Sequence, residues 1–286
     1  EDHSQHTGSD WVWTSDNRMI WVNWQPYVHP HSVPPPFSQL TLGLGYDPNI
    51  SEGSDWPEAV TLVGLPHSSA NAVLSPQASK VIGFDVADNA IIWDLEPQSL
   101  RVRLYGVNDA VWSPDETMLV TYGVDGVLRV IDSTSGEILH SFDDHFNPAY
   151  AGSPDRLKVF WSPDSRFIAY GSNGKLKRSE LTGANAQVLC DAARLVGGSW
   201  SKDGTIVFTA DYSTLLMQVS AQGGEPKPVN MKTEGDIEHR FPHFLPDGRH
   251  FLLPRRGGIW VGSLDSPEMK QISDVRSAAV YAPPGW

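Results

Sequence analysis

The feature that most constrains this chain is a phrase of about ten residues that recurs along it. The clearest copy, at positions 111–120, reads VWSPDETMLV, and similar copies surround Trp161, Trp200 and Phe244. Weaker copies begin at Trp13 and Leu74, and a truncated one begins at Tyr281. The successive intervals between these anchors are 61, 38, 49, 39, 44 and 37 residues. All intervals but the first fit a supersecondary unit of about 40–50 residues that stacks on copies of itself.

Each copy of the phrase predicts a β-hairpin. An apolar or aromatic residue ends one strand, Ser-Pro-Asp-Gly or a variant forms the turn, and an apolar run forms the next strand, as at 166–170. Third strands are expected at 127–131 and 259–262, and fourth strands at 138–142, 186–189 and 270–272. Four short strands per unit, repeated radially, predict an all-β β-propeller.

The number of anchors predicts six blades of four antiparallel strands in a single domain over residues 1–286, with seven blades as the alternative. The seventh blade requires a degenerate repeat within the long first interval. We expect a C-terminal strand at 278–281 to pair with the first blade around 10–24. Such a strand closes the ring and removes the exposed sheet edges that favour aggregation.

The first blade is predicted to hold a Pro-rich, acidic insertion at residues 25–58. Its proline run cannot form a central strand, because proline lacks the N–H that a sheet requires. An extended polyproline surface loop is expected, either as a solvated loop or as a docking segment. Residues 1–70 contain eight acidic residues and one basic residue, so much of the net charge of −13 lies in this segment.

The acidic balance argues against binding to nucleic acid or to an anionic membrane surface, since both require clustered Lys and Arg. No apolar run is long enough for membrane insertion. The single cysteine, Cys190, excludes an internal disulfide and is expected to be a buried core residue.

Motifs for catalysis are missing from the sequence. It contains no Gly-x-Ser-x-Gly elbow, phosphate-binding loop, dinucleotide fingerprint or His-Glu-x-x-His. Two groups with metal-ligating side chains, His29 with His31 and His140 with residues 143–145, lack a complete ligand set and are interpreted as surface residues. The recurring Asp115, Asp164, Asp203 and Asp247 are interpreted as turn residues. We therefore predict no catalytic residues, no metal site and no cofactor.

Residues that precede the first strand of each blade are expected to line a central funnel. Several of these positions carry basic, imidazole or amide side chains, which suit a carboxylate, a phosphate or an acidic peptide. A water-filled channel with solvated rim charges is the alternative. The funnel candidates are His67, Asn71, Asn108, Asp109, Arg156, Lys158, Arg194, His239, Arg240 and Arg276.

The repeated phrase resembles that of TolB-like propellers. Residues 195–286, with GGSW at 197–200, HRFPHFLPDGRHFL at 239–252 and AVYAPPG at 279–285, are similar to propellers appended to bacterial serine/threonine kinases. Residues 84–145, with IWD at 92–94 and VIDSTSGE at 130–137, resemble WD-repeat blades. The resemblance implies a bacterial interaction or ligand-sensing module, but a propeller supports many functions.

We therefore expect a non-catalytic, monomeric propeller that binds a protein or a small ligand at its rim or funnel. The alternative is a hydrolase or lyase, similar to lactonases or glycosidases, with its site in the funnel. No targeting segment identifies a compartment; we favour a periplasmic or other extracytoplasmic location.

Overall fold

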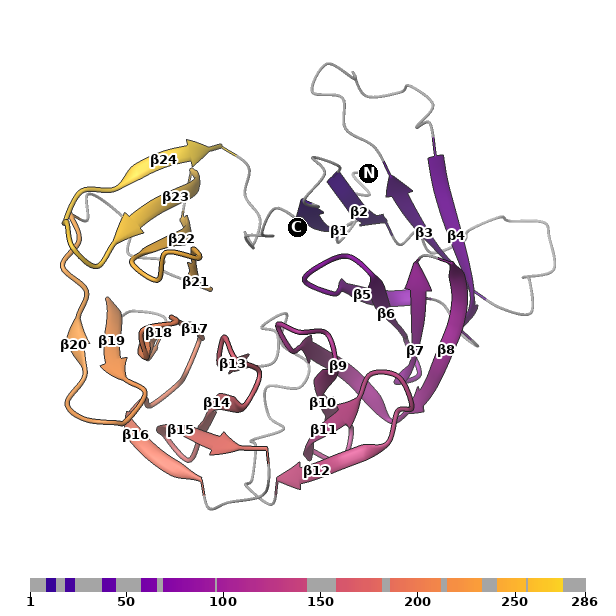
Figure 1. The fold of residues 1–286 in the computed structure, drawn as a ribbon, viewed down its shortest axis with the longest axis horizontal. Helices are drawn as coiled ribbons and strands as arrows, with labels where there is room; N and C mark the ends of the chain where they lie inside the picture. Colours follow the sequence, from indigo (N-terminus) through magenta and orange to yellow (C-terminus); the bar gives the residue numbers. More distant parts are fainter. Residues whose placement is uncertain are drawn as a thin grey trace, which may run out of the picture.

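The computed structural model describes residues 9–13, 19–23, 38–44, 58–65, 69–95, 97–142, 158–181, 186–211, 215–232, 241–255 and 257–274. Before residue 72, side chains are described only at positions 62, 64 and 65. The described residues form six antiparallel sheets, each built from four consecutive strands. The first strand of each sheet lies nearest the centre and the fourth lies outermost (Figure 1). Within the described part, no helix is long and apolar enough to cross a membrane.

The strands follow one another regularly along the chain. The first sheet contains β1 (Ser9–Trp13), β2 (Met19–Asn23), β3 (Ser38–Leu44) and β4 (Glu58–Leu65). The second contains β5 (Ser69–Leu74), β6 (Lys80–Asp85), β7 (Asn89–Leu95) and β8 (Gln98–Tyr105). The third contains β9 (Val107–Trp112), β10 (Met118–Gly123), β11 (Leu128–Asp132) and β12 (Ile138–Phe142).

The C-terminal half continues the pattern. The fourth sheet contains β13 (Val159–Trp161), β14 (Phe167–Ser172), β15 (Lys175–Glu180) and β16 (Gln187–Asp191). The fifth contains β17 (Gly197–Trp200), β18 (Thr205–Thr209), β19 (Leu216–Ser220) and β20 (Lys227–Pro228). The sixth contains β21 (His243–Phe244), β22 (His250–Arg255), β23 (Gly258–Ser263) and β24 (Lys270–Ser273).

The repeated phrase marks the innermost strand of every sheet. β1, β5, β9, β13, β17 and β21 end on the anchor residues at 13, 74, 112, 161, 200 and 244, as the sequence predicted. The turn that follows has a left-handed fourth residue in five sheets, with φ of 55° at Ala78, 59° at Glu116, 58° at Ser165, 78° at Gly204 and 74° at Gly248. Glycine adopts this conformation without strain, which explains its recurrence in the phrase.

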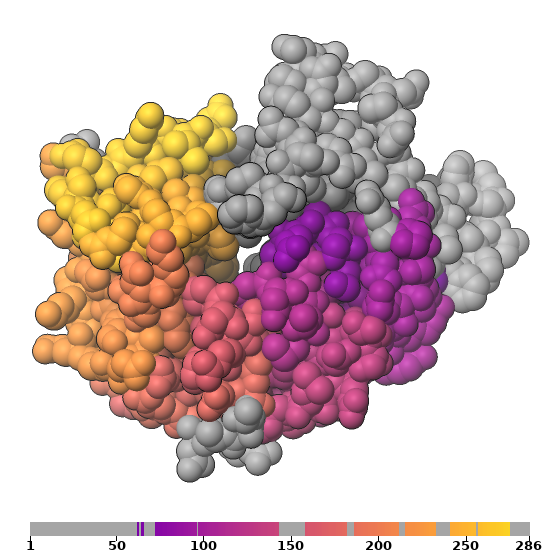
Figure 2. Space-filling model, viewed as in Figure 1, coloured from indigo at the N-terminus to yellow at the C-terminus, as the bar shows by residue number. Residues whose placement is uncertain are grey.

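The hydrophobic core lies between neighbouring sheets. Five clusters of buried side chains occupy the five successive seams from β1–β4 through β21–β24. At two of these seams a repeat tryptophan also donates a hydrogen bond to the preceding sheet: Trp112 Nε1 to Val73 O and Trp161 Nε1 to Val111 O, each 3.1 Å. Sheets β5–β24 pack side by side without a break (Figure 2). The apolar anchors therefore join each blade to its neighbour.

The fold class predicted from the sequence is corrected in blade count. Five blades, β5–β24, have four antiparallel strands with described side chains, and no seventh sheet occurs among the described residues. The remaining sheet, β1–β4, takes all four strands from residues 9–65, and β1 pairs with β2. The prediction of six or seven blades is therefore wrong, and the propeller has five blades of four antiparallel strands.

The long first interval contains two strands instead of an additional blade. β3 and β4 pair over seven positions, from Ser38 with Leu65 to Leu44 with Glu58. β3 lies within the segment 25–58 that the sequence assigned to an insertion, so part of that segment belongs to the sheet. Residues 24–37 and 45–57, and the expected closing strand at 278–281, lie outside the described residues.

Candidate functional site

The connections between strands fall on two opposite ends of the molecule, because consecutive strands are antiparallel. The Ser-Pro-Asp turns between the first and second strands lie on one end, which we call the turn face. The links between the second and third strands, and from each outer strand to the next blade, lie on the other end, the link face. Residues 85–89, 105–109 and 123–127 belong to the link face of blades β5–β8 and β9–β12.

On the turn face, the carboxylates of three recurring aspartates, Asp115, Asp164 and Asp247, hold the hairpin turns. Asp115 Oδ1 accepts hydrogen bonds from Ser113 Oγ (2.6 Å) and Thr117 N (3.1 Å). Burial raises the pKa of Asp115, but the bonds from Ser113 and Thr117 outweigh it and the pKa is lowered. Asp164 Oδ1 repeats the arrangement with Ser162 Oγ at 2.6 Å. These carboxylates are therefore structural.

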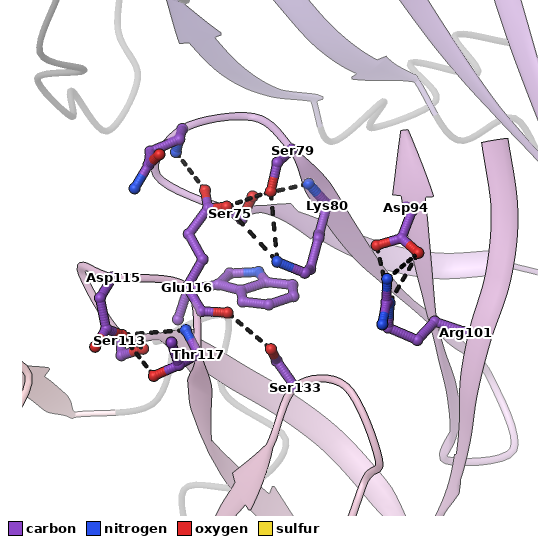
Figure 3. Close-up of polar contacts among 12 residues, drawn as sticks. Ser75, Ser79, Lys80, Asp94, Arg101, Ser113, Asp115, Glu116, Thr117 and Ser133 are labelled. Atoms are coloured by element: carbon purple, nitrogen blue, oxygen red, sulfur yellow. Dashed lines mark hydrogen bonds and ion pairs between the residues drawn. The ribbon is translucent and has the colours of Figure 1, made fainter. Parts of the chain in front are cut away.

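Glu116 departs from the glycine of the phrase and joins two blades. Its buried carboxylate accepts hydrogen bonds from Gln77 N (2.5 Å) and Ser79 Oγ in the turn of the preceding blade, and Lys80 Nζ lies 3.9 Å away (Figure 3). Ser165 occupies the same turn position one blade later, and its Oγ accepts a bond from Asp115 N (3.2 Å). Both residues thus connect consecutive turns through their side chains.

Asp247 is the turn carboxylate with the largest pKa shift. Partial desolvation raises its pKa, but hydrogen bonds from the backbone N–H groups of His250 and Arg249 (2.9 Å each) and from His250 Nδ1 (2.5 Å) lower it to about 2. The ordinary value is 3.8. This carboxylate therefore stabilises the fold fully above pH 3.8, and its contribution is lost as the pH falls through about 2.

The His250→Ala variant is expected to raise the pKa of Asp247 toward 3.8, because one of three donors is lost. The variant should be modestly less stable than the wild type above about pH 3.8, and this difference should vanish as the pH falls through about 2. The loss is modest because the Asp247 side chain is 48 % exposed and solvent screens the pair. Carboxyl ¹³C titration by NMR measures the shift, and thermal melting between about pH 5 and pH 2 measures the stability. An unchanged Asp247 titration in the variant contradicts this assignment.

The predicted funnel residues are described only in part. Asn71 lies in β5, Asn108 and Asp109 lie in β9, Lys158 directly precedes β13, and Arg194 lies between β16 and β17. The side chain of Asn71 is not among those described. Asp109 Oδ1 accepts a bond from the N–H of Ala110 (2.8 Å), and Arg194 is exposed. His67, Arg156, His239, Arg240 and Arg276 lie outside the described residues.

The structure brings Lys158 together with Phe241, an aromatic residue that the sequence analysis did not select. The Lys158 Nζ lies 5.1 Å from the centroid of the Phe241 ring, which is within the range of a cation–π contact. Phe241 has a φ of 53° and lies against Gly197, where an added Cβ would stand 3.0 Å from its Cδ1. Only a glycine in β17 leaves Phe241 this room.

The link face also carries large apolar side chains that the sequence did not single out. Tyr105, Val86 and Val124 are 75 %, 67 % and 61 % exposed, the highest values among the described large hydrophobic residues. Val124 N donates to Gly106 O (3.1 Å), and Val124 Cγ2 lies 3.7 Å from the position of a Cβ on Gly106. Asn89, at the end of the turn that contains Val86, pairs with Tyr105. We call these three side chains the link-face patch.

Other groups with potential reactivity are held in structural roles. Burial raises the pKa of the Cys190 thiol to about 11, and the residue packs in the core between the fourth and fifth sheets, as predicted. Among the residues with described placement, no three His, Cys, Asp or Glu side chains gather where they could hold a metal ion.

Comparison with known proteins shows that one segment of the chain is similar to a known repeat. Residues 99–132 match the family described as WD domain, G-beta repeat. The chain is also similar to the small ribosomal subunit protein RACK1y of Oryza sativa subsp. japonica, with 26 % identity over 168 residues, which cover 52 % of this chain and 47 % of that protein. The chain thus spans about half the length of this relative. The segment that matches this repeat runs from β8 through β11, across the seam between blades β5–β8 and β9–β12 of the β-propeller.

Proposed function

We propose that this propeller is a non-catalytic scaffold that binds a protein partner through the link-face patch. The observation that carries the proposal is the exposure of Tyr105, Val86 and Val124 on one face of two adjacent blades. Exposed apolar side chains that lie singly are common on protein surfaces, but a group of them marks an interaction site. Tyrosine in particular is enriched among the residues that dominate binding energy.

The rigidity of the surrounding blades supports the proposal. The strands that carry the patch pack on a core in which Ile82, Ile92 and Leu119 are completely buried. A rigid surface loses little conformational entropy when it binds a partner. More of the free energy of its apolar contacts is therefore available as binding affinity. The WD-type repeat spans this same seam, and propellers of that type typically serve as protein-interaction scaffolds. The relative's name associates that protein with the small ribosomal subunit; from it we take only the general role of a scaffold.

The Tyr105→Ser variant is expected to weaken peptide binding at least about tenfold, because truncation of a central aromatic anchor costs about 1.4 kcal/mol or more. The probe is a random peptide library displayed on phage and selected against the immobilised full chain. Val124→Ser should weaken the selected peptides less, since valine buries less apolar area.

A matched control is Ile272→Ser, which removes an exposed apolar side chain from β24, in another blade (54 % exposed). This variant should bind the selected peptides as the wild type does. Peptides that bind all three variants equally well, or a library from which nothing is retained, would show that the patch is not the binding surface.

A second candidate function uses the funnel. We propose that Lys158 and Arg194, which both precede innermost strands on the link face, help to bind an acidic ligand together with the other funnel candidates. Support comes from the Lys158–Phe241 contact, which holds a cation beside the start of β21. Thermal melting with citrate or phosphate tests this candidate, since a ligand of the native state must raise the melting temperature.

Finer expectations from the sequence belong to the same proposal. They are a TolB-like character of residues 195–286, a bacterial origin, an extracytoplasmic location, a monomeric state and one domain over residues 1–286. The copy of the phrase around Phe244, at the end of β21, supports the TolB-like character of residues 195–286. The hydrolase or lyase alternative has no supporting cluster among the described side chains, and we do not propose it.

A further inference from the structure

The surroundings of the link-face patch are acidic. Four carboxylates and two guanidinium groups lie in or beside the three links: Asp85, Asp88, Asp109 and Asp125, with Arg103 and Arg129. Asp88 lies two residues after Val86, and Asp125 directly follows Val124. The Asp125 side chain is 47 % exposed, but its ion pair with Arg129 compensates its charge at the edge of the patch.

The basic groups near the patch are engaged within the protein. Arg129 forms an ion pair with Asp125, and its hydrogen bond lowers the pKa of that carboxyl, which is therefore ionised at neutral pH. Arg103 Nη1 donates to Gly64 O (2.7 Å), at the end of β4. The carboxylate of Asp85 accepts bonds from Ala87 N (2.8 Å) and Asn89 N (2.9 Å), which fixes the turn that presents Val86.

The net charge of the whole chain favours a cationic partner, as the carboxylates near the patch do. The net charge is −13 at pH 7, so the long-range field attracts cations to any rigid, exposed surface. A second copy of the chain is a poor occupant of the patch, because two acidic surfaces would face each other. A cationic partner gains both the long-range attraction and the local pairing with carboxylates.

We propose that the link-face patch binds a peptide segment that carries apolar anchors flanked by Lys or Arg. This inference rests on the proposed function above and specifies its partner. The apolar anchors cover Val86, Tyr105 and Val124, and the flanking cations lie against Asp88 and Asp109. Apolar contact supplies most of the affinity, while the carboxylates select the basic sequence.

The test uses short fluorescent peptides with identical apolar positions and with Lys, Ser or Glu at all remaining positions, titrated against the full chain. The Lys peptide should bind tightest and the Glu peptide weakest. Raising NaCl from about 0.05 M to about 0.5 M should weaken the Lys peptide and leave the Ser peptide nearly unchanged. The double variant Asp88→Asn/Asp109→Asn should weaken the Lys peptide about threefold to tenfold, and the Ser peptide hardly at all.

The two substitutions preserve the local backbone. Asn tolerates the left-handed conformation of Asp88, whose φ is 60°, and Asn at 109 can still accept the bond from Ala110 N. The matched control is Glu137→Gln/Glu225→Gln, which changes the net charge equally through exposed residues of the turn face. This control should retain nearly all Lys-peptide affinity, and an equal loss in it would show that only the overall charge matters.

The outcomes separate this inference from the proposed function. If all three peptides bind alike and Tyr105→Ser weakens them alike, the cationic preference is wrong and the scaffold function stands. If no peptide binds, or if Tyr105→Ser has no effect, both are wrong. Light scattering that finds a dimer dissociated by Tyr105→Ser would also overturn the inference, because a second copy would then occupy the patch.

Discussion

The Trp161→Ala variant is expected to lose about 3–5 kcal/mol of unfolding free energy, the range found when a buried large aromatic is truncated. Trp161 ends β13 and belongs, with Val120, Val130 and Tyr170, to the buried cluster between the third and fourth sheets. The substitution also removes the hydrogen bond that Trp161 Nε1 donates to the carbonyl oxygen of Val111. For a chain of this size such a loss lowers the melting temperature by roughly 10 °C.

Two further variants separate the contributions at this seam. Trp161→Phe keeps most of the apolar area and should lose only about 1–2 kcal/mol, mainly the hydrogen bond. Ile272→Ala removes an exposed side chain and should change stability by less than about 0.5 kcal/mol. Thermal or denaturant unfolding of the full chain measures all three. A Trp161→Ala protein as stable as Ile272→Ala would refute the role of the repeat aromatic as a seam residue.

The Glu116→Ala variant should lose about 2–4 kcal/mol, because Gln77 N–H and the Ser79 hydroxyl lose a charged acceptor at a buried seam. Glu116→Gly should be the more stable of the two by about 1 kcal/mol, since glycine relieves the left-handed backbone at this position. Denaturant unfolding of the two variants measures both the loss and the order.

The matched control for Glu116 is Ser165→Ala, at the same turn position one blade later. It removes a single 3.2 Å bond from Asp115 N and should cost about 1 kcal/mol. Equal losses in Glu116→Ala and Ser165→Ala would contradict the larger role of the Glu116 carboxylate. A Glu116→Gly protein less stable than Glu116→Ala would contradict the backbone argument.

The sequence predicted the blades themselves well, because each blade is a local structure. The phrase around Trp112 encodes a strand end, a turn and the next strand within about ten residues, and the predicted strand at 138–142 coincides with β12. The number of blades was predicted wrongly. The spacing of the anchors counts copies of the phrase, and that count does not by itself decide how many sheets become blades of the propeller.

The Glu116 contact and the link-face patch differ in how clearly the sequence indicates them. A charged residue in place of glycine at Glu116 is a visible departure from the phrase, although its partners Gln77 and Ser79 lie 39 and 37 residues away. The link-face patch has a weaker signal, an apolar residue inside each of two tight turns, at Val86 and Val124. The exposure of Tyr105 follows the alternation along β8, in which Val102 and Leu104 are buried and Arg103 and Tyr105 are exposed.

The residue at the left-handed turn position differs between the repeated units of this chain. Ala78, Glu116, Ser165, Gly204 and Gly248 occupy equivalent places, yet their side chains differ, and only those of Glu116 and Ser165 are seen to hydrogen-bond to the preceding turn. Glu116 fits only a neighbour that offers Gln77 N–H and Ser79, whereas Gly248 leaves room for the Lys202 side chain, whose Cγ would lie 3.1 Å from an added Cβ. The repeated units are therefore not interchangeable, because the contacts at one seam differ from those at another.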